Sequence, residues 1–169
     1  MLQVIHQQLG IPSDYGVRCG MPLQEECGDL VSVGADAFGR PAQLEAATAA
    51  AWNQLQQAAA LAGHTLQLVS AFRSIDYQRQ LFQRKLERGL AIADILKVNA
   101  APGYSEHHSG RALDLGCDGY AHLEEEFERS PAFAWLTAHA REFGFRLSFP
   151  RDNPYGVLYE PWHWYFEGI

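Results

Sequence analysis

Hydrophobic and polar positions change period along residues 41–99, and each period predicts a different element. Residues 41–63 are rich in Ala with Pro41 near the start and Gly63 at the end, which predicts a helix. Residues 65–72 alternate and predict a strand. Residues 74–89 open on a Ser and close on a Gly, which predicts a second helix, and 90–99 reads as a shorter one.

The remaining pattern is irregular at the start of the chain and strand-rich at its end. Residues 111–116 and the segments 145–150 and 159–166 read as short strands. Residues 121–144 read as helical, with a break near Ser130–Pro131. Residues 1–40 are rich in Gly and Pro and predict an irregular arm with one short strand at "DLVSVG". The mixture lacks a β-α-β rhythm, so we expect an α+β fold in which helices flank a small antiparallel sheet.

Length and composition narrow the class of protein. A chain of 169 residues with 47% hydrophobic and 20% charged residues suits one globular domain spanning residues 1–169. The net charge of −7 and the lack of a Lys/Arg cluster argue against nucleic acid as a partner. No apolar run is long enough for a membrane span.

The start of the chain and the cysteines give information on the cellular compartment in which the protein is expected to work. No export signal is visible at the start, so the sequence predicts a cytoplasmic protein, or a periplasmic or extracellular one if the chain is a processed form. Cys19, Cys27 and Cys117 read as reduced thiols, although Cys19 and Cys27 would be free to pair in an exported chain.

Several common catalytic motifs are absent from the sequence. It contains no HExxH, no GxSxG, no Ser-x-x-Lys, no P-loop and no GxGxxG. His122 and Glu126 stand four apart in a predicted helix, but their Glu-rich surroundings favour a solvated face over a metal half-site.

Two clusters of chemically active residues remain, and together they match a zinc site. The first holds His107, His108 and Asp114, and the second holds Glu160 and His163. Two imidazoles and one carboxylate bind zinc and leave a coordination position for water, whose pKa then falls to about 7. A further carboxylate off the metal would accept the proton of that water and return it to a leaving amine.

The local pattern suggests how these residues meet. Gly110 permits a turn between His107 and Asp114. Asp114 lies between two leucines of a predicted strand, so it points away from the face they bury. Glu160 and His163 are an odd number of positions apart, so a bend at Pro161 is needed for both to reach one metal. The pattern alone does not choose between His107 and His108, and it leaves a purely structural role open.

The motifs around these residues resemble a known family. "SEHHSGRALD" is similar to the SxHxxGxAxD signature of the zinc D-alanyl-D-alanine carboxypeptidases and dipeptidases of the vancomycin-resistance type. "EPWHW" resembles their second signature, and "SAFRSIDYQ" resembles their upstream Ser-x-x-Arg-Ser…Gln segment. The three occur in the family's order, within a predicted catalytic core of residues 65–166. The resemblance implies the fold shared with lysostaphin-like peptidases and the hedgehog signalling domain.

The resemblance also implies a role for individual residues. The metal ligands would be His107, Asp114 and His163, while His108 falls on a variable position. Glu160 would be the catalytic base, and Arg73 would stabilise the oxyanion. Ser105, Gln78 and Trp162 match positions implied to contact substrate, although capping, solvated or core roles are about as compatible with their residue types.

The function implied is removal of the terminal D-Ala from peptidoglycan-type peptides, with one Zn²⁺ per chain, a metal-bound water and Glu160 as general base. The alternatives within the family are an L,D-carboxypeptidase, a D-Ala-D-Ala dipeptidase and a cell-wall endopeptidase. A non-catalytic, zinc-stabilised peptidoglycan-binding module is a fourth alternative. The sequence departs from the family pattern at one position, since Tyr165 stands where many relatives carry Arg. This difference bears on how the substrate is recognised and not on the metal site.

Overall fold

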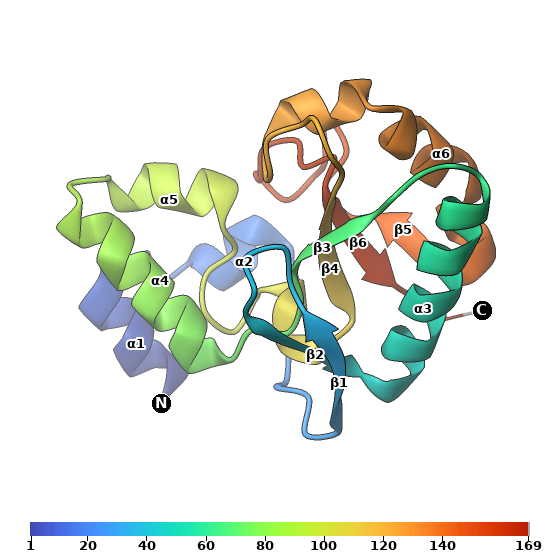
Figure 1. Ribbon diagram of the computed structural model, residues 1–169. Coiled ribbons are helices and arrows are strands. Elements are labelled where there is room, and N and C mark those ends of the chain that lie inside the picture. The colour runs from blue at the N-terminus through green and yellow to red at the C-terminus, as the bar shows by residue number, and fades with distance from the viewer. Residues whose placement is uncertain (169) are drawn as a thin grey trace.

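The centre of the fold is a four-stranded antiparallel sheet, seen in the computed structural model of Figure 1, which describes residues 1–168. Its strand order is β3–β4–β6–β5. The strands are β3 (Gln67–Ser70), β4 (Ala112–Gly116), β5 (Phe145–Leu147) and β6 (His163–Phe166). The α+β class with a small antiparallel sheet is therefore confirmed.

Two helices cover one face of this sheet and form the main hydrophobic core with it. They are α3 (Ala46–Leu61) and α6 (Pro131–His139), on the right in Figure 1. Leu55 of α3 and Leu136 of α6 are fully buried together with Leu113 and Leu115 of β4. Burying these side chains is the dominant force that holds the helices on the sheet.

A second group of helices forms its own hydrophobic cluster on the left in Figure 1. These helices are α1 (Leu2–Leu9), α2 (Tyr15–Cys19), α4 (Ile75–Glu87) and α5 (Ile92–Val98). Phe82 of α4 and Ile95 of α5 are fully buried against side chains of α1 and α2. Residues 1–168 thus contain two hydrophobic clusters, one built on the sheet and one on helices α1, α2, α4 and α5.

A separate hairpin packs on the main hydrophobic core through Ala42 and Leu44. It consists of β1 (Leu30–Ala35) and β2 (Pro41–Glu45), which pair antiparallel. The hairpin lies against β3, since Ala37 N–H donates to the Leu68 carbonyl at 2.7 Å and Phe72 N–H donates to the Gln43 carbonyl at 3.0 Å. Three 3-10 turns complete the fold: η1 (Glu106–Ser109), η2 (Glu125–Arg129) and η3 (Ala140–Phe143).

Most predicted elements in the second half of the chain occur where the pattern placed them. Ser74 caps α4 by accepting a hydrogen bond from Tyr77 N–H at 3.0 Å, as the expected Ser start implies. Ser130 caps α6 in the same way, with Pro131 in its first turn, so the predicted break in 121–144 separates α6 from the preceding η2. Residues 121–124, however, are not helical.

Two predictions about the first half of the chain are wrong. The helix expected over 41–63 begins only at Ala46, because residues 41–45 pair with β1 as a strand and Glu45 caps the helix through Thr48. The short strand expected at "DLVSVG" is confirmed as β1, but the rest of the arm of residues 1–40 is not irregular throughout, since it contains α1 and α2. Its short helices gain their stability from packing against α4 rather than from local propensity.

Two further observations concern the cysteines and the membrane. Cys19, Cys27 and Cys117 are all free thiols. Within residues 1–168, the helices are too short or too polar to cross a bilayer.

Candidate active site

The register of the central sheet brings two of the predicted metal ligands together. Asp114 of β4 is directly opposite His163 of β6. Leu113 and Leu115 face the main core, as the alternating pattern predicts, so Asp114 points the other way. The Asp114 Oδ1 atom lies 3.1 Å from His163 Nδ1. Cross-strand pairing therefore fixes this contact without help from any loop.

A tight turn positions the third predicted ligand, His107. The η1 turn ends at Gly110, whose φ of +69° is accessible to Gly at little cost. A Cβ atom there would lie 2.9 Å from the backbone nitrogen of Glu45, so the turn also needs Gly for space. The turn places His107 Nε2 3.2 Å from Asp114 Oδ1. The ligand atoms of His107, Asp114 and His163 all lie within 4.8 Å of one another.

The hydrogen bonds of the His107 ring indicate that a cation belongs between these atoms. His107 Nδ1 lies 2.6 Å from the Ala71 carbonyl oxygen, which only accepts, so the ring proton resides on Nδ1. Burial lowers the pKa of His107 to about 4, so the ring is neutral and Nε2 faces the Asp114 carboxylate with a lone pair. Two acceptors facing each other in a buried site fit a metal ion. One carboxylate and two imidazoles suit zinc.

His163 is held between two carboxylates, one of which the sequence reading did not identify. Its Nε2 lies 2.8 Å from Glu106 Oε2, and Glu106 in turn accepts from Arg146 at 3.0 Å and from Ser148 at 2.5 Å. Burial alone would lower the pKa of His163, but the hydrogen bonds to Asp114 and Glu106 raise it to about 10. The ring therefore favours a cation at Nδ1, either a proton or a metal.

The role of Glu106 follows from this contact. A carboxylate on the outer nitrogen of a ligating histidine fixes its tautomer and orientation. Burial would raise the pKa of Glu106, but the hydrogen bond and charge of His163, the Ser148 hydrogen bond and the Arg146 charge together lower the pKa to about 2, so Glu106 stays ionised. The only signal in the sequence was an acid directly before His107, which is too weak to separate Glu106 from a solvated side chain.

Glu160 stands beside the three ligands without joining them. The predicted bend at Pro161 is present, since His163 N–H donates to the Glu160 carbonyl at 3.2 Å across a turn. The turn leaves Glu160 Oε2 3.9 Å from His163 Nδ1. No side-chain hydrogen bond to Glu160 occurs among residues 1–168, and burial raises its pKa to about 7. A carboxyl group with a near-neutral pKa suits a general base.

Arg73 approaches the site from the opposite side of Asp114. Its Nη2 lies 3.2 Å from Asp114 Oδ2, the oxygen that does not face the histidines. Its Nη1 donates to Gln78 Oε1 at 3.4 Å, while the Nε atom has no hydrogen-bond partner in the described part of the chain. The guanidinium is therefore oriented by two side chains, Asp114 and Gln78, while its Nε atom is buried without a partner among residues 1–168.

A third side chain, His108, also holds Arg73 in place, and Gln78 is itself anchored to the backbone. His108 Nδ1 donates to the Arg73 carbonyl at 2.6 Å, and its Nε2 accepts from Gly103 N–H at 3.1 Å. Gln78 donates to the Ala100 carbonyl at 2.9 Å in addition to its contact with Arg73. Both residues thus position the arginine. Gln78, expected to contact substrate, has its amide groups largely engaged within the protein.

The site opens into a cleft between the two hydrophobic clusters. The cleft has a volume of about 510 Å³, and Arg73, Asp114, Glu160 and Trp162 are among its lining residues. A smaller recess of about 30 Å³ adjoins it, lined in part by Ser105, Gln78, His107 and His163. Ser105 is buried at this recess, and Trp162 lines the cleft while also packing against the main core.

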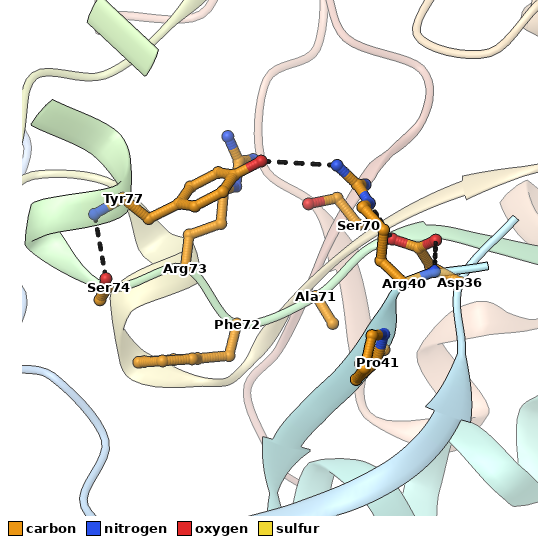
Figure 2. Close-up of a pocket in the computed structure, with 10 residues that line it drawn as sticks. Asp36, Arg40, Pro41, Ser70, Ala71, Phe72, Arg73, Ser74 and Tyr77 are labelled. Atoms are coloured by element: carbon orange, nitrogen blue, oxygen red, sulfur yellow. Dashed lines mark hydrogen bonds and ion pairs between the residues drawn. The ribbon is translucent and has the colours of Figure 1, made fainter. Parts of the chain in front are cut away.

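Figure 2 shows a second hollow, of about 270 Å³, next to Arg73. Tyr77 and Arg40 face each other across it, with the Tyr77 hydroxyl 3.4 Å from Arg40 Nη1. Arg40 is also paired with Asp36 at 2.7 Å. Arg73 lines both hollows, whereas none of the candidate metal ligands lines this second one.

Comparison with known proteins gives related sequences. A D-alanyl-D-alanine carboxypeptidase from Enterococcus faecium is 35% identical over 102 residues, a match that covers 59% of this chain and 29% of that protein. The bifunctional D-Ala-D-Ala dipeptidase and D-Ala-D-Ala carboxypeptidase VanXYC from Enterococcus gallinarum is 32% identical over 132 residues, covering 75% of this chain and 68% of that protein. The chain thus spans less than a third of the first relative and about two thirds of the second.

Solved structures share the fold. The LD-carboxypeptidase LdcB is 28% identical with a TM-score of 0.76, covering 87% of this chain and 72% of that one. The D,D-pentapeptidase VanY in complex with Zn(II) is 26% identical with a TM-score of 0.67, covering 88% and 83%. The VanY family model, described as D-alanyl-D-alanine carboxypeptidase, matches residues 41–169. With the ligand set, the motifs and this match, the chain belongs to the VanY family of D-alanyl-D-alanine carboxypeptidases.

Proposed function

We propose that this protein is a zinc-dependent D,D-carboxypeptidase that releases the terminal D-Ala from peptidoglycan-type peptides. The observation that carries the proposal is the convergence of the His107–Asp114–His163 set with Glu160 and Arg73 at one cleft. A buried ligand set without a base would suit a structural metal, whereas a carboxyl group beside the ligands suits hydrolysis.

The three ligands would hold one zinc ion, as the lone-pair arrangement around Asp114 Oδ1 supports. When bound, zinc acts as a Lewis acid toward the scissile carbonyl and the attacking water. Glu106 keeps the His163 ring oriented with Nδ1 toward Asp114. Asp114 uses its second oxygen to keep Arg73 at the same place.

Glu160 and Arg73 carry out the remaining steps. Glu160 accepts a proton from the attacking water and then delivers it to the nitrogen of the departing D-Ala, so the carboxylate is regenerated. The Arg73 guanidinium stabilises negative charge that develops on the carbonyl oxygen. Its contacts with Asp114 and Gln78 pre-orient it, so little reorganisation is needed during the reaction.

L,D-carboxypeptidase activity on a tetrapeptide is the second candidate. The TM-score of 0.76 with the LD-carboxypeptidase LdcB favours it. Both activities release D-Ala, and they differ in the residue before the scissile bond. The ligands, base and arginine would serve either reaction, so the difference has to be read from the products.

Mass spectrometry of peptide products tests the proposal. A zinc-loaded sample is incubated with a muramyl pentapeptide ending in D-Ala-D-Ala and, separately, with the tetrapeptide. We expect the pentapeptide to lose one alanine and a chelator to abolish the loss. Loss of alanine from the tetrapeptide alone would favour the second candidate, and loss of the dipeptide would indicate a dipeptidase. Binding without any cleavage would indicate a peptidoglycan-binding module and refute the enzyme.

The Glu160→Gln variant tests the base. We expect it to retain zinc while turnover falls by about 10²- to 10⁴-fold, the usual contribution of a positioned acid–base group. Glu126→Gln is the matched control, because Glu126 is an exposed carboxylate outside the cleft. A zinc-containing Glu160→Gln protein with a rate near that of the unmodified protein would contradict the assignment.

A further inference from the structure

A chain of hydrogen bonds connects the N-terminal arm to Arg73. The hydroxyl of Tyr15, in α2, accepts from Ala101 N–H at 3.1 Å. The Ala100 carbonyl belongs to the same peptide unit and accepts from Gln78 Nε2 at 2.9 Å. Gln78 Oε1 in turn accepts from Arg73 Nη1 at 3.4 Å. The arm carries none of the three motifs, yet it reaches the arginine through one peptide unit and one side chain.

The geometry of this hydrogen-bond chain makes each link depend on the one before it. The peptide unit between Ala100 and Ala101 is planar and trans, so its N–H and its carbonyl point in opposite directions. The Tyr15 hydroxyl therefore fixes the direction in which the carbonyl meets Gln78. The Gln78 amide fits in only one orientation, because its NH₂ group faces a carbonyl and its oxygen faces a guanidinium.

The links of the chain are shielded from water, which makes their loss costly. Tyr15, Gln78 and Ala101 are all buried. Burial raises the pKa of Tyr15 to about 12, so its hydroxyl stays neutral near pH 7. A buried N–H that loses its acceptor keeps the full cost of its desolvation. Without the Tyr15 hydroxyl, the Ala101 N–H would be in that state, and movement of the peptide unit toward another acceptor would be favoured.

The arm also holds the residues that follow this peptide unit. Gln24 N–H donates to the Gly103 carbonyl at 2.8 Å. His6 Nε2 lies 2.8 Å from the Pro102 carbonyl oxygen. Together with the Tyr15 contact, these bonds hold three successive residues of the loop between α5 and η1. The arm therefore fixes the position of the loop as a whole, and Tyr15 is its direct link to the side chain that orients the arginine.

We propose that Tyr15 is a positioning residue that sets the orientation of Arg73 through this hydrogen-bond chain. The inference rests on the proposed function, since it takes Arg73 as the group that stabilises charge on the carbonyl oxygen. That charge develops in the transition state, so a displaced guanidinium lowers kcat more than it weakens substrate binding. Tyr15 itself lines neither the cleft nor the small recess, so it acts on the reaction only through other residues.

Steady-state kinetics of the zinc-loaded protein on the pentapeptide test this role. Tyr15→Phe keeps the ring and removes only the hydroxyl. We expect kcat to fall by about 3- to 10-fold, the effect of losing one hydrogen bond of ordinary strength, while KM stays within about twofold. Tyr155→Phe is the matched control, because Tyr155 packs on the same cluster and its hydroxyl makes no hydrogen bond among residues 1–168. An equal fall in both variants, or no fall in Tyr15→Phe, would overturn the proposal.

A double-mutant cycle tests the route from Tyr15 to Arg73. Gln78→Met breaks the link between the peptide unit and the guanidinium. We expect Tyr15→Phe to lower kcat no further in a protein that already carries Gln78→Met, because effects that pass through a shared partner are not additive. If the two separate effects multiply in the double variant, Tyr15 acts by another route, and the hydrogen-bond chain is refuted as its cause.

Nuclear magnetic resonance gives a measurement that does not depend on turnover. The Arg73 Nε atom is buried without a partner among the described residues, and its N–H signal is identified by its loss in Arg73→Lys. We expect Tyr15→Phe to shift this signal. Leu9→Ala removes another buried side chain of the same cluster, so it should lower the melting temperature but leave both the signal and kcat unchanged.

The outcomes separate this proposal from the proposed function. An Arg73 signal that Tyr15→Phe leaves in place, or that Leu9→Ala shifts equally, would overturn the positioning role. Failure of the unmodified protein to release D-Ala from either peptide would refute the proposed function alone. The position of the Arg73 signal would then still decide whether Tyr15 orients the guanidinium.

Discussion

Glu106 offers a sharp test of how the metal site is built, because it touches a ligand without being one. Its Oε2 atom holds His163 Nε2 at 2.8 Å, and Arg146 and Ser148 hold Glu106 in turn. Glu106→Gln keeps the shape of the side chain but replaces one acceptor oxygen by an NH₂ group. If that group faces Arg146, two donors oppose each other. If it faces His163, the ring proton must move to Nδ1, the atom that would bind the metal.

Either arrangement weakens zinc binding. Loss of a carboxylate on the outer nitrogen of a ligating histidine typically lowers metal affinity by 10- to 100-fold. We therefore expect the zinc dissociation constant of Glu106→Gln to rise by about that factor, equivalent to about 1.4–2.7 kcal/mol. Competition with a chromophoric chelator at fixed pH measures the constant, and urea unfolding of the metal-free proteins checks that the fold is intact.

Glu167→Gln is the matched control for this experiment. Glu167 accepts from Arg146 Nε at 2.6 Å but makes no contact with His163, so it tests the loss of an Arg146 partner alone. We expect its zinc affinity to stay within about twofold of the unmodified protein, as for other half-exposed surface pairs. Equal zinc affinity in Glu106→Gln and the unmodified protein would refute the idea that Glu106 orients His163.

Two predictions concern stability. Glu45 accepts hydrogen bonds from Thr48 N–H and Thr48 Oγ1 at the start of α3; burial would raise its pKa, but these bonds lower it. Its stabilising effect is therefore present above the ordinary pKa of Glu and lost as the pH falls through the lowered value. Urea unfolding should show that Glu45→Gln lowers the free energy of unfolding by about 1 kcal/mol at pH 7, and by progressively less below pH ~4. The control variant Glu126→Gln should leave this free energy unchanged. A loss of stability in Glu45→Gln that does not depend on pH would contradict the capping role of the Glu45 carboxylate. Phe82→Ala should lower the free energy of unfolding by about 3–5 kcal/mol, because Phe82 is fully buried in the second cluster. The control variant Leu61→Ala, at an exposed position, should lower it by less than ~0.5 kcal/mol. Similar losses in the two variants would contradict the packing of Phe82.

The local sequence determined those helix starts, strands and turns whose sequence patterns span only a few residues. The Ser74 and Ser130 caps, the alternation around Asp114 and the odd spacing of Glu160 and His163 each correspond to a feature of the structure. Caps, strand alternation and turns are short-range effects, so a sequence reading reaches them.

Tertiary structure decided the features that depend on distant partners. Residues 41–45 form a strand because β1 is available to pair with them, and the helices of residues 1–29 form because α4 and α5 bury their apolar sides. Local propensity contains neither partner, which explains both errors in the first half of the chain.

The choice between His107 and His108 shows the same division within the site. The residues alone leave it open, because two adjacent histidines in a Gly-punctuated turn are chemically alike. In the fold, His107 Nδ1 donates to the Ala71 carbonyl and turns Nε2 toward Asp114, whereas His108 Nδ1 donates to the Arg73 carbonyl and its Nε2 is occupied by Gly103 N–H. The sequence by itself supplied the residue types that bind zinc and move a proton. Only the tertiary structure assigned each ring its role, since that assignment depends on backbone carbonyls more than thirty positions away along the chain.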